Sequence, residues 1–541
     1  MKFKRSIALL LVLLATMLAP TIISAQGGKS VTIGWPQEPD SLNPMYTTMT
    51  YAGYTISLFY SGAWAVNSDL QPVPVLVSEI PTTENGGISE DGTTFTLKLK
   101  DGLTWSDGEA LTSADFLFTA EMFQSEKNSP LGRGLYQDMV EVTAPDATTV
   151  VVKFANPLAA WLGLFSFVLP EHVFRPVFDA DGSLDNAPQN REPTVSSGPY
   201  TFTEWNVGNF MSFTANPGYT LGQPKIDTLI VRFFGDDETY VNSLVAGEIS
   251  IATFFDWSYA PKIEEAGITV QAIPSGYNEG WFFNVGESGH PALQDVNVRK
   301  AVSMAFDRLA ITEDLFYGAT YPGSSFWEAT PFANPDLKPV AFDPDAANKL
   351  LDDAGWVDSN GDGSRDKDGV ELELRFVTNT RPIRAETIGP IVQQQLGAVG
   401  VKVELQSYPS DQYFNGYAEG GPIATGQYDI AEWSSSPDAF PDPHTRSFRC
   451  DEVPSPENPS GSNWNYYCDE KLTDLFKQEQ EETDSAKRIE LFHEIDQMIY
   501  DSSIWTNIWF DADSWAVAPN LTADVNGVSP FWNVEQWDLT Q

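Results

Sequence analysis

The fold is decided by the stretch ELELRFVTNTRPIRAETIGPIVQQQLGAVGVKVEL (residues 371–405). Apolar and charged residues alternate over 371–376, which is the pattern of a strand with one buried face. Apolar residues then recur every three or four positions over 388–396, as on one face of a helix, and the alternation returns over 401–405. This strand–helix–strand order predicts a parallel, right-handed α/β unit, with ligands expected near the carboxyl ends of its strands.

Upstream of this unit, residues 343–355 carry matching start and stop signals for a helix. Asp343 can cap it, Pro344 suits its first turn, and Gly355 suits its end. The loop that follows (358–366) has the spacing of a calcium loop. Its oxygen ligands would be Asp358, Asn360, Asp362, Ser364 and Asp366. However, Gly369 stands where a bidentate Glu belongs, so an acidic turn between helix and strand is the simpler interpretation.

Nearer the start, residues 95–100 alternate in the same way as a strand, between Asp-Gly pairs that favour turns. Thr112 and Asp115 then have the spacing of a capping box at a helix start. The N-terminal part is therefore expected to contain a mixed α+β unit.

The composition excludes some classes of partner. The chain has 541 residues, 42% of them hydrophobic, and a formal net charge of −44. Such a length and apolar content can fill several cores. A surface this negative repels phosphate backbones, so nucleic acid is not expected as a partner. Most of the charge is interpreted as a solvated exterior, with steering of cationic ligands as the alternative.

The first residues have the order of a secretion signal, expected at 1–25. Lys2, Lys4 and Arg5 precede an apolar run, and Ser24 and Ala25 supply a cleavage site. We expect a secreted periplasmic or extracellular protein associated with the cell envelope. It is not expected to be a lipoprotein, because no cysteine follows the cleavage point. Cys450 and Cys468 are predicted to form a disulfide in that oxidising compartment, with two buried thiols as the alternative.

No catalytic motif stands out. His493-Glu494 begins like a zinc-protease helix, but Gln497 replaces the second imidazole ligand, and there is no Gly-x-Ser-x-Gly elbow. No cofactor is expected beyond the calcium alternative. Paired carboxylates occur by chance in so acidic a chain, which leaves a secreted hydrolase open as the other class of function.

A colinear set of segments runs through almost the whole chain. They are EPDSLNP (38–44), DGTTFTLKLKDGLTWSDG (91–108), SGPY (197–200), NPGY (216–219), VAGEI (245–249) and DVNVRKAVSMAFDR (295–308). Together they resemble the extracellular solute-binding proteins of family 5, which include peptide-binding components of ABC importers.

The resemblance implies an α/β, two-lobe periplasmic-binding-protein-like fold (type II, cluster C) with an extra α+β domain inserted in the N-terminal lobe. The expected limits are 26–60, 180–275 and 510–541 for lobe I, 61–179 for the inserted domain and 276–509 for lobe II. The lobes would close over a solute and deliver it to a membrane permease. The protein would be a monomer and no enzyme, and a role in sensing is the alternative to import.

The resemblance also implies site residues. In peptide-binding relatives an aspartate shortly after a tryptophan holds the ligand's amino group. Here Trp433 is the tryptophan, Ser436 stands in the acid's place, and Asp438 follows two residues later. This departure leaves an oligosaccharide open beside the peptide. The other expected ligand-binding residues are Trp257, Tyr277, Trp281 and Tyr46, each with core packing as its alternative. A hinge role would suit Tyr277 and Trp281 equally.

Overall fold

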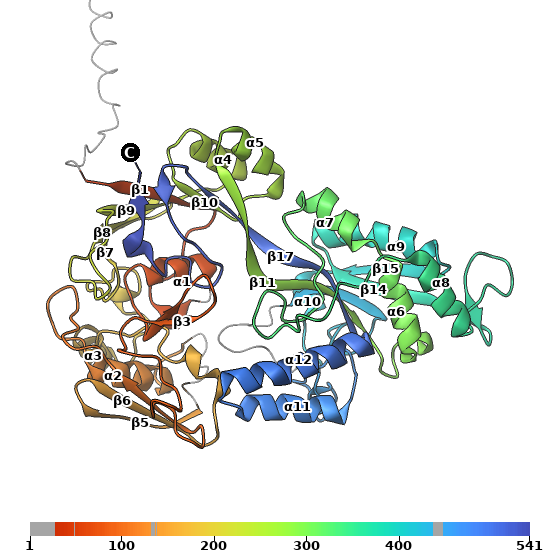
Figure 1. The fold of residues 1–541 in the computed structure, drawn as a ribbon, viewed down its shortest axis with the longest axis horizontal. Helices are drawn as coiled ribbons and strands as arrows, with labels where there is room; N and C mark the ends of the chain where they lie inside the picture. Colours follow the sequence, from red (N-terminus) through yellow and green to blue (C-terminus); the bar gives the residue numbers. More distant parts are fainter. Residues whose placement is uncertain (1–27, 48, 131–135, 137, 436–446, 541) are drawn as a thin grey trace, which may run out of the picture.

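A ten-stranded sheet runs through the molecule, in a computed structural model that describes residues 28–540 except 48, 131–135, 137 and 436–446. Its strands lie in the order β15 (Lys402–Tyr408), β14 (Glu373–Asn379), β16 (Ile430–Ser435), β11 (Thr269–Phe283), β17 (Trp505–Val517), β10 (Ile251–Thr253), β1 (Ser30–Trp35), β9 (Thr228–Phe233), β8 (Phe210–Ala215) and β7 (Tyr200–Asn206). The long antiparallel strands β11 and β17 extend from one half of the molecule into the other (Figure 1). One two-stranded ribbon, the hinge ribbon, therefore joins the two halves. The expected secretion signal lies outside the described residues.

The first half is built on β1, which pairs in parallel with both β9 and β10. Val31 and Ile33 of this strand are fully buried, because helices cover both faces of the sheet. Helix α1 (Thr50–Ser57) packs on one face, in the large core of this half. Helices α4 (Asp237–Val245) and α5 (Ala260–Glu265) pack on the other face, around a smaller core.

A separate three-stranded sheet lies beside the first half. Its strands are β4 (Thr94–Lys98), β6 (Thr149–Phe154) and β5 (Met139–Asp146), and its helices are α2 (Ser113–Gln124) and α3 (Glu171–Asp181). The predicted capping box is confirmed at the start of α2. The Asp115 carboxylate accepts from the backbone amide of Thr112, and the Thr112 side chain accepts from the backbone amide of Asp115. The apolar residues of this unit belong to the same continuous core as those of the first half. The two are thus packed as one body.

The second half confirms the predicted strand–helix–strand unit. Strands β14 and β15 pair in parallel, and α9 (Gly389–Gly397) connects them after a π-helical turn at Ile383–Ile388. The predicted helix after Asp343 is α8 (Pro344–Asp353). It packs with α6 (Val296–Met304) on the same face as α9, whereas α11 (Glu470–Glu481) and α12 (Ser485–Ser502) pack on the opposite face. The remaining helices of this half are α7 (Arg308–Phe316) and α10 (Ser410–Tyr413).

Three short two-stranded sheets contain the remaining strands of the described residues. They are β2 (Trp64–Val66) with β3 (Pro72–Pro74), β12 (Asp366–Lys367) with β13 (Val370–Glu371), and β18 (Leu521–Thr522) with β19 (Asp538–Leu539). Within the described part of the chain, no helix combines the length and apolar character that a membrane crossing needs.

The hinge ribbon is irregular where it passes between the halves. Its pairing register shifts between Pro274 and Asn278, and Gly276 between them has a φ of +80°. Ser275 Oγ donates to the carbonyl of Asp511 at 3.2 Å and accepts from the amide of Tyr277 at 3.2 Å. Such a bulge bends a strand and increases its twist. The two-lobe α/β fold is confirmed, while the exact domain limits stay predictions.

Candidate functional site

A cavity of about 480 Å³, which we call the hinge cavity, lies where the two halves meet. The first half contributes Ser68, Leu70 and the segment Val525–Val528 to its wall, and the second half contributes Glu328–Pro331. The floor is the hinge ribbon itself, through residues 272–276 and Phe510. Any solute in this cavity touches both halves and the strands that connect them, so it favours one relative orientation of the halves.

A second cavity of about 440 Å³, the α1 cavity, adjoins the first. Its lining comes from the first half and the unit beside it, and consists of Pro44, Thr47, Met49, Thr50, Gly53, Tyr54, Ile56, Ser57, Tyr60, Ser166, Phe167, Val528, Ser529 and Pro530. Val528 lines both cavities. The two spaces are therefore neighbours that share one lining residue. Each falls within the range of about 300–1,000 Å³ that small-molecule sites occupy.

Two carboxyl groups mark the hinge ribbon between the halves. Asp511 and Asp513 stand two positions apart on β17, so both point to the same face of the sheet. Burial and the nearby Glu279 raise the pKa of Asp511 to about 7. Burial and Asp511 likewise raise the pKa of Asp513 to about 7. These carboxyls thus lose their protons near neutral pH, well above the ordinary range of an aspartate.

A buried polar network holds the hinge ribbon to the second half. Arg384 Nε and Nη2 donate to the two carboxylate oxygens of Glu279, each at 2.6 Å. Ser434 Oγ on β16 lies 2.5 Å from Glu279 Oε2 and accepts from Arg384 Nη2 at 2.7 Å. The network therefore links β11 to the strand end that carries Trp433.

Comparison with known proteins places this geometry in a family. Residues 71–450 match the protein family described as "Bacterial extracellular solute-binding proteins, family 5 Middle". The oligopeptide-binding protein AppA of Bacillus subtilis is 26% identical over 536 residues, which cover 95% of this chain and 92% of AppA.

The chain belongs to family 5 of the bacterial extracellular solute-binding proteins.

Solved structures have the same fold. The substrate-binding protein CtaP of an ABC transporter from Listeria monocytogenes has a TM-score of 0.77 at 25% identity, covering 95% of this chain and all of CtaP. AppA in complex with a nonapeptide has a TM-score of 0.67 at 23% identity, covering 95% of this chain and 99% of AppA. The family match and the curated relatives, rather than the shared fold alone, confirm the predicted role as substrate-binding component of an ABC importer.

Trp433 and Tyr277, two of the predicted ligand-binding residues of this family 5 protein, lie near the hinge ribbon. The Trp433 ring stacks on Phe282 with centroids 3.5 Å apart and planes 4° apart, and its edge meets Trp464. Only 7% of Trp433 is exposed, and it belongs to a buried core of the second half and lines neither cavity. Tyr277 is 48% exposed within the hinge bulge, directly after two residues that line the hinge cavity.

The other predicted site residues are placed differently. Trp281 is fully buried, packs on Phe306 and donates from Nε1 to Glu432 Oε2 at 3.0 Å. Trp257 packs beside Phe255 and lines neither cavity. Tyr46 packs against the large core, next to residues that line the α1 cavity. Asp438 lies outside the described residues. Ligand contact by each of the six predicted residues, Trp433 and Tyr277 included, stays a prediction.

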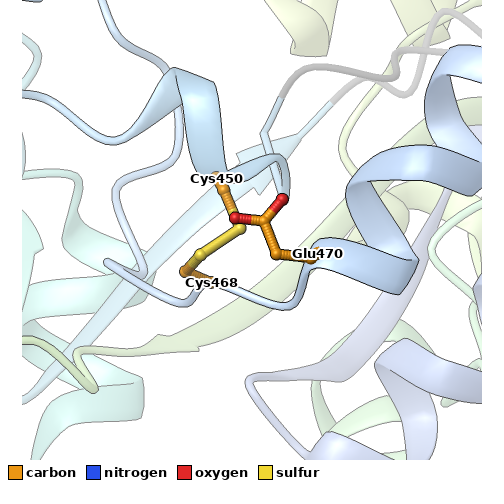
Figure 2. Close-up of side chains that lie close together, drawn as sticks. All are labelled: Cys450, Cys468 and Glu470. Atoms are coloured by element: carbon orange, nitrogen blue, oxygen red, sulfur yellow. A yellow bond between two sulfur atoms is a disulfide. The ribbon is translucent and has the colours of Figure 1, made fainter.

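The two cysteines form a disulfide (Figure 2). In the described part of the chain, Cys450, Cys468 and Glu470 make the one group of three potential metal ligands within 4.8 Å of one another. Both sulfurs are already bonded to each other, so this group offers a metal only a carboxylate. The disulfide links the short helix at Cys450–Glu452 to the start of α11.

The predicted calcium loop uses its oxygen atoms within its own turn. Asp358 accepts from the amides of Gly361 at 2.6 Å and Gly363 at 3.0 Å. Asp366 accepts from the hydroxyl of Ser359, and Asp362 accepts from the amide of Ser364. Such hydrogen bonds within the loop are what the simpler interpretation, an acidic turn between helix and strand, predicts. Calcium binding stays a prediction without support from these contacts.

The sequence analysis missed the residues that line the hinge cavity and those that line the α1 cavity. The main omission is the segment 525–530, which contributes to both linings. One signal was present in the sequence, because Asn526-Gly527 is a strong turn-forming pair. That pair predicts a turn but says nothing of what the turn contacts. Its position beside the hinge ribbon depends on tertiary contacts.

Proposed function

We propose that this family 5 protein captures peptides between its two halves and presents them intact to the permease of an ABC importer. The hinge cavity carries the proposal, because its wall comes from both halves and its floor from the ribbon that joins them. A bound peptide would stabilise the closed arrangement through contacts with each half. The 26% identity to an oligopeptide-binding protein over 95% of the chain supports a peptide as the solute.

Binding without catalysis fits the buried carboxyl pair of the second half. Glu279 and Glu432 are neighbouring carboxyl groups, and their side chains are only 2% and 0% exposed. Burial, with the Glu279 carboxylate beside it, raises the pKa of Glu432 well above its ordinary range. No substrate reaches these groups in this arrangement. Their role is to join strands β11 and β16.

Tyr277 is the predicted site residue that we carry into the proposal. Its half-exposed ring stands in the hinge bulge, and aromatic rings offer peptides a large apolar face at a small cost in conformational entropy. We expect Tyr277→Ala to weaken peptide binding about 5- to 30-fold, equal to about 1–2 kcal/mol. Leu309→Ala is the matched control, because Leu309 is 57% exposed on α7 and lines neither cavity.

Native mass spectrometry of the protein secreted by its host tests the proposal directly. The expected spectrum shows one small-molecule adduct per chain, which denaturation releases as a set of short peptides. Calorimetric titration with those peptides should give one site, and chromatography should return each peptide uncleaved. A released oligosaccharide, or cleavage of the peptides with turnover, would overturn the proposal. Secretion is checked in the same host by locating the protein outside the cytoplasm.

A further inference from the structure

A turn near the C-terminus contributes to the lining of both cavities. Val528 in this turn lines both the hinge cavity, of about 480 Å³, and the α1 cavity, of about 440 Å³. Its side chain is apolar and yet 43% exposed. An exposed valine between two cavities offers an apolar contact on each side to whatever occupies them.

Side-chain hydrogen bonds fix the position of Val528. Asn526 Oδ1 accepts from the amides of Val528 at 2.9 Å and Ser529 at 2.6 Å. Asn526 Nδ2 donates to the carbonyl of Val66 at 3.1 Å, and Tyr54 Oη donates to the carbonyl of Gly527 at 3.2 Å. The turn is thereby anchored to the first half at two separate places. Val528 is a fixed divider rather than a side chain on a loose loop.

The turn also touches the hinge ribbon directly. A Cβ atom added to Gly527 would lie 2.4 Å from the carbonyl oxygen of Pro274, which is closer than any side chain tolerates. Only glycine allows this approach. Val528 therefore keeps a constant position relative to the floor of the hinge cavity.

The described lining of the two cavities carries almost no charge. The α1 cavity has apolar residues and hydroxyl groups and no acidic or basic side chain. The hinge cavity has one carboxylate, Glu328, and its Oε2 already accepts from the amides of Ser324 at 2.8 Å and Ser325 at 3.1 Å. An anionic group of a solute would lose part of its hydration in either cavity and find no opposite charge, and a cationic group would find only Glu328, in the hinge cavity.

We propose that Val528 is a specificity-determining residue and that the solute places one uncharged, apolar group on each side of it. This inference rests on the proposed function. It narrows the ligand to an elongated peptide that carries neutral apolar side chains at the two positions flanking Val528. Charged side chains of the peptide stay outside the two cavities.

The test uses Val528→Trp, which fills space in both cavities, and Val528→Asp, which adds a charge to both. Val207→Trp is the matched control, because Val207 is 65% exposed in the turn between β7 and β8 and lines neither cavity. Thermal unfolding establishes that all variants fold like the wild type. Calorimetry then measures binding of peptides with Leu or Phe side chains and of matched peptides with Asp or Lys.

We expect the wild type to bind the apolar peptides at least tenfold more tightly than the charged ones. Val528→Trp should lose at least tenfold in affinity for apolar peptides, whereas Val207→Trp should stay within twofold. Val528→Asp should reduce the preference for Leu peptides over Lys peptides, or reverse it. Unchanged affinities in both folded Val528 variants would overturn this inference and leave the proposed function standing. A wild type that binds none of the peptides would overturn the proposed function itself.

Discussion

Arg384 forms a bidentate ion pair with Glu279 inside the second half, and their side chains are 3% and 2% exposed. Glu279 belongs to the hinge ribbon, and Arg384 belongs to the turn that follows β14. The pair is therefore a fixed joint between the hinge ribbon and the body of the second half. Ser434 extends this joint to the strand that ends next to the predicted ligand segment.

Breaking this pair should destabilise the protein strongly. Arg384→Met leaves the Glu279 carboxylate buried without its partner, and the loss of one member of a buried pair costs about 3–5 kcal/mol. The free energy of unfolding from urea titration measures the effect. The double variant Glu279→Gln with Arg384→Met should recover part of the loss, because it leaves no buried charge.

The exposed pair Lys349–Asp353 provides the control, with side chains 73% and 61% exposed. Lys349→Met should change the free energy of unfolding by less than about 0.5 kcal/mol. If Arg384→Met were as mild as Lys349→Met, the Arg384–Glu279 contact would not be a structural joint.

Three buried carboxyl groups should lower the free energy of unfolding of this protein as the pH rises through neutrality. Burial is the first cause that raises the pKa of Asp496, Asp511 and Asp513 to about 7. Because each pKa is higher in the folded than in the unfolded state, the folded state holds more protons between about pH 4 and pH 7. Their stabilising contribution is complete below about pH 4 and is lost as the pH rises through 7.

Asn imitates the protonated carboxyl, so Asp511→Asn with Asp513→Asn should flatten this dependence. At pH 8 the double variant should exceed the wild type in free energy of unfolding by on the order of 1–2 kcal/mol per site, after allowance for partial exposure. Asp501→Asn, at an exposed position near the end of α12, is the control and should leave the slope unchanged. Parallel curves for the hinge variant and the wild type would contradict the assignment.

Local patterns in the sequence predicted the second half well. Helix α8 begins one residue after Asp343, whose side chain accepts from the amide of Ala346, and Gly355 follows its end with a φ of +82°. Strands β14 and β15 follow the alternation that the sequence shows. These elements are decided by neighbours within a few positions, which is why periodicity and caps reveal them.

The hinge ribbon and the cavities depend on contacts that no local pattern carries. Strand β11 contains Pro274 and Gly276, which read as a turn, and Glu279, which reads as exposed. Pairing with β17 keeps the strand continuous through that turn signal, and Arg384, 105 positions away, makes the burial of Glu279 tolerable. Val528 likewise lines the cavities because a distant strand and helix hold its turn.

Removing the disulfide should cost stability without changing the fold. Cys450 and Cys468 close a loop of 18 residues, and a crosslink of that span stabilises by about 3 kcal/mol in the chain-entropy model. The variant with Ser at both positions should lose about that free energy of unfolding. Dithiothreitol should lower the melting temperature of the wild type toward that of the variant and leave the variant unaffected. Equal sensitivity of both proteins to the reductant would show that the disulfide is not the cause.

Gly527→Ala should separate the cavity-dividing turn from the hinge ribbon. The added methyl group would meet the carbonyl oxygen of Pro274 at 2.4 Å, and the backbone of Pro274 is paired within the ribbon, so the turn itself must move. Such overpacking costs about 1–3 kcal/mol in the free energy of unfolding. Displacing the turn also shifts Val528, so peptide affinity should fall together with stability.

Gly397→Ala is the matched control for that substitution. Gly397 is the last residue of α9, and a Cβ atom there would meet nothing within 4 Å. Alanine in a helix is favoured over glycine by about 0.5–1 kcal/mol, so this variant should be as stable as the wild type or slightly more stable. Chemical denaturation and calorimetric titration of both variants check the pair. A Gly527→Ala protein with wild-type stability and affinity would mean that the turn does not rest on the ribbon, and Val528 would then have no fixed place between the cavities.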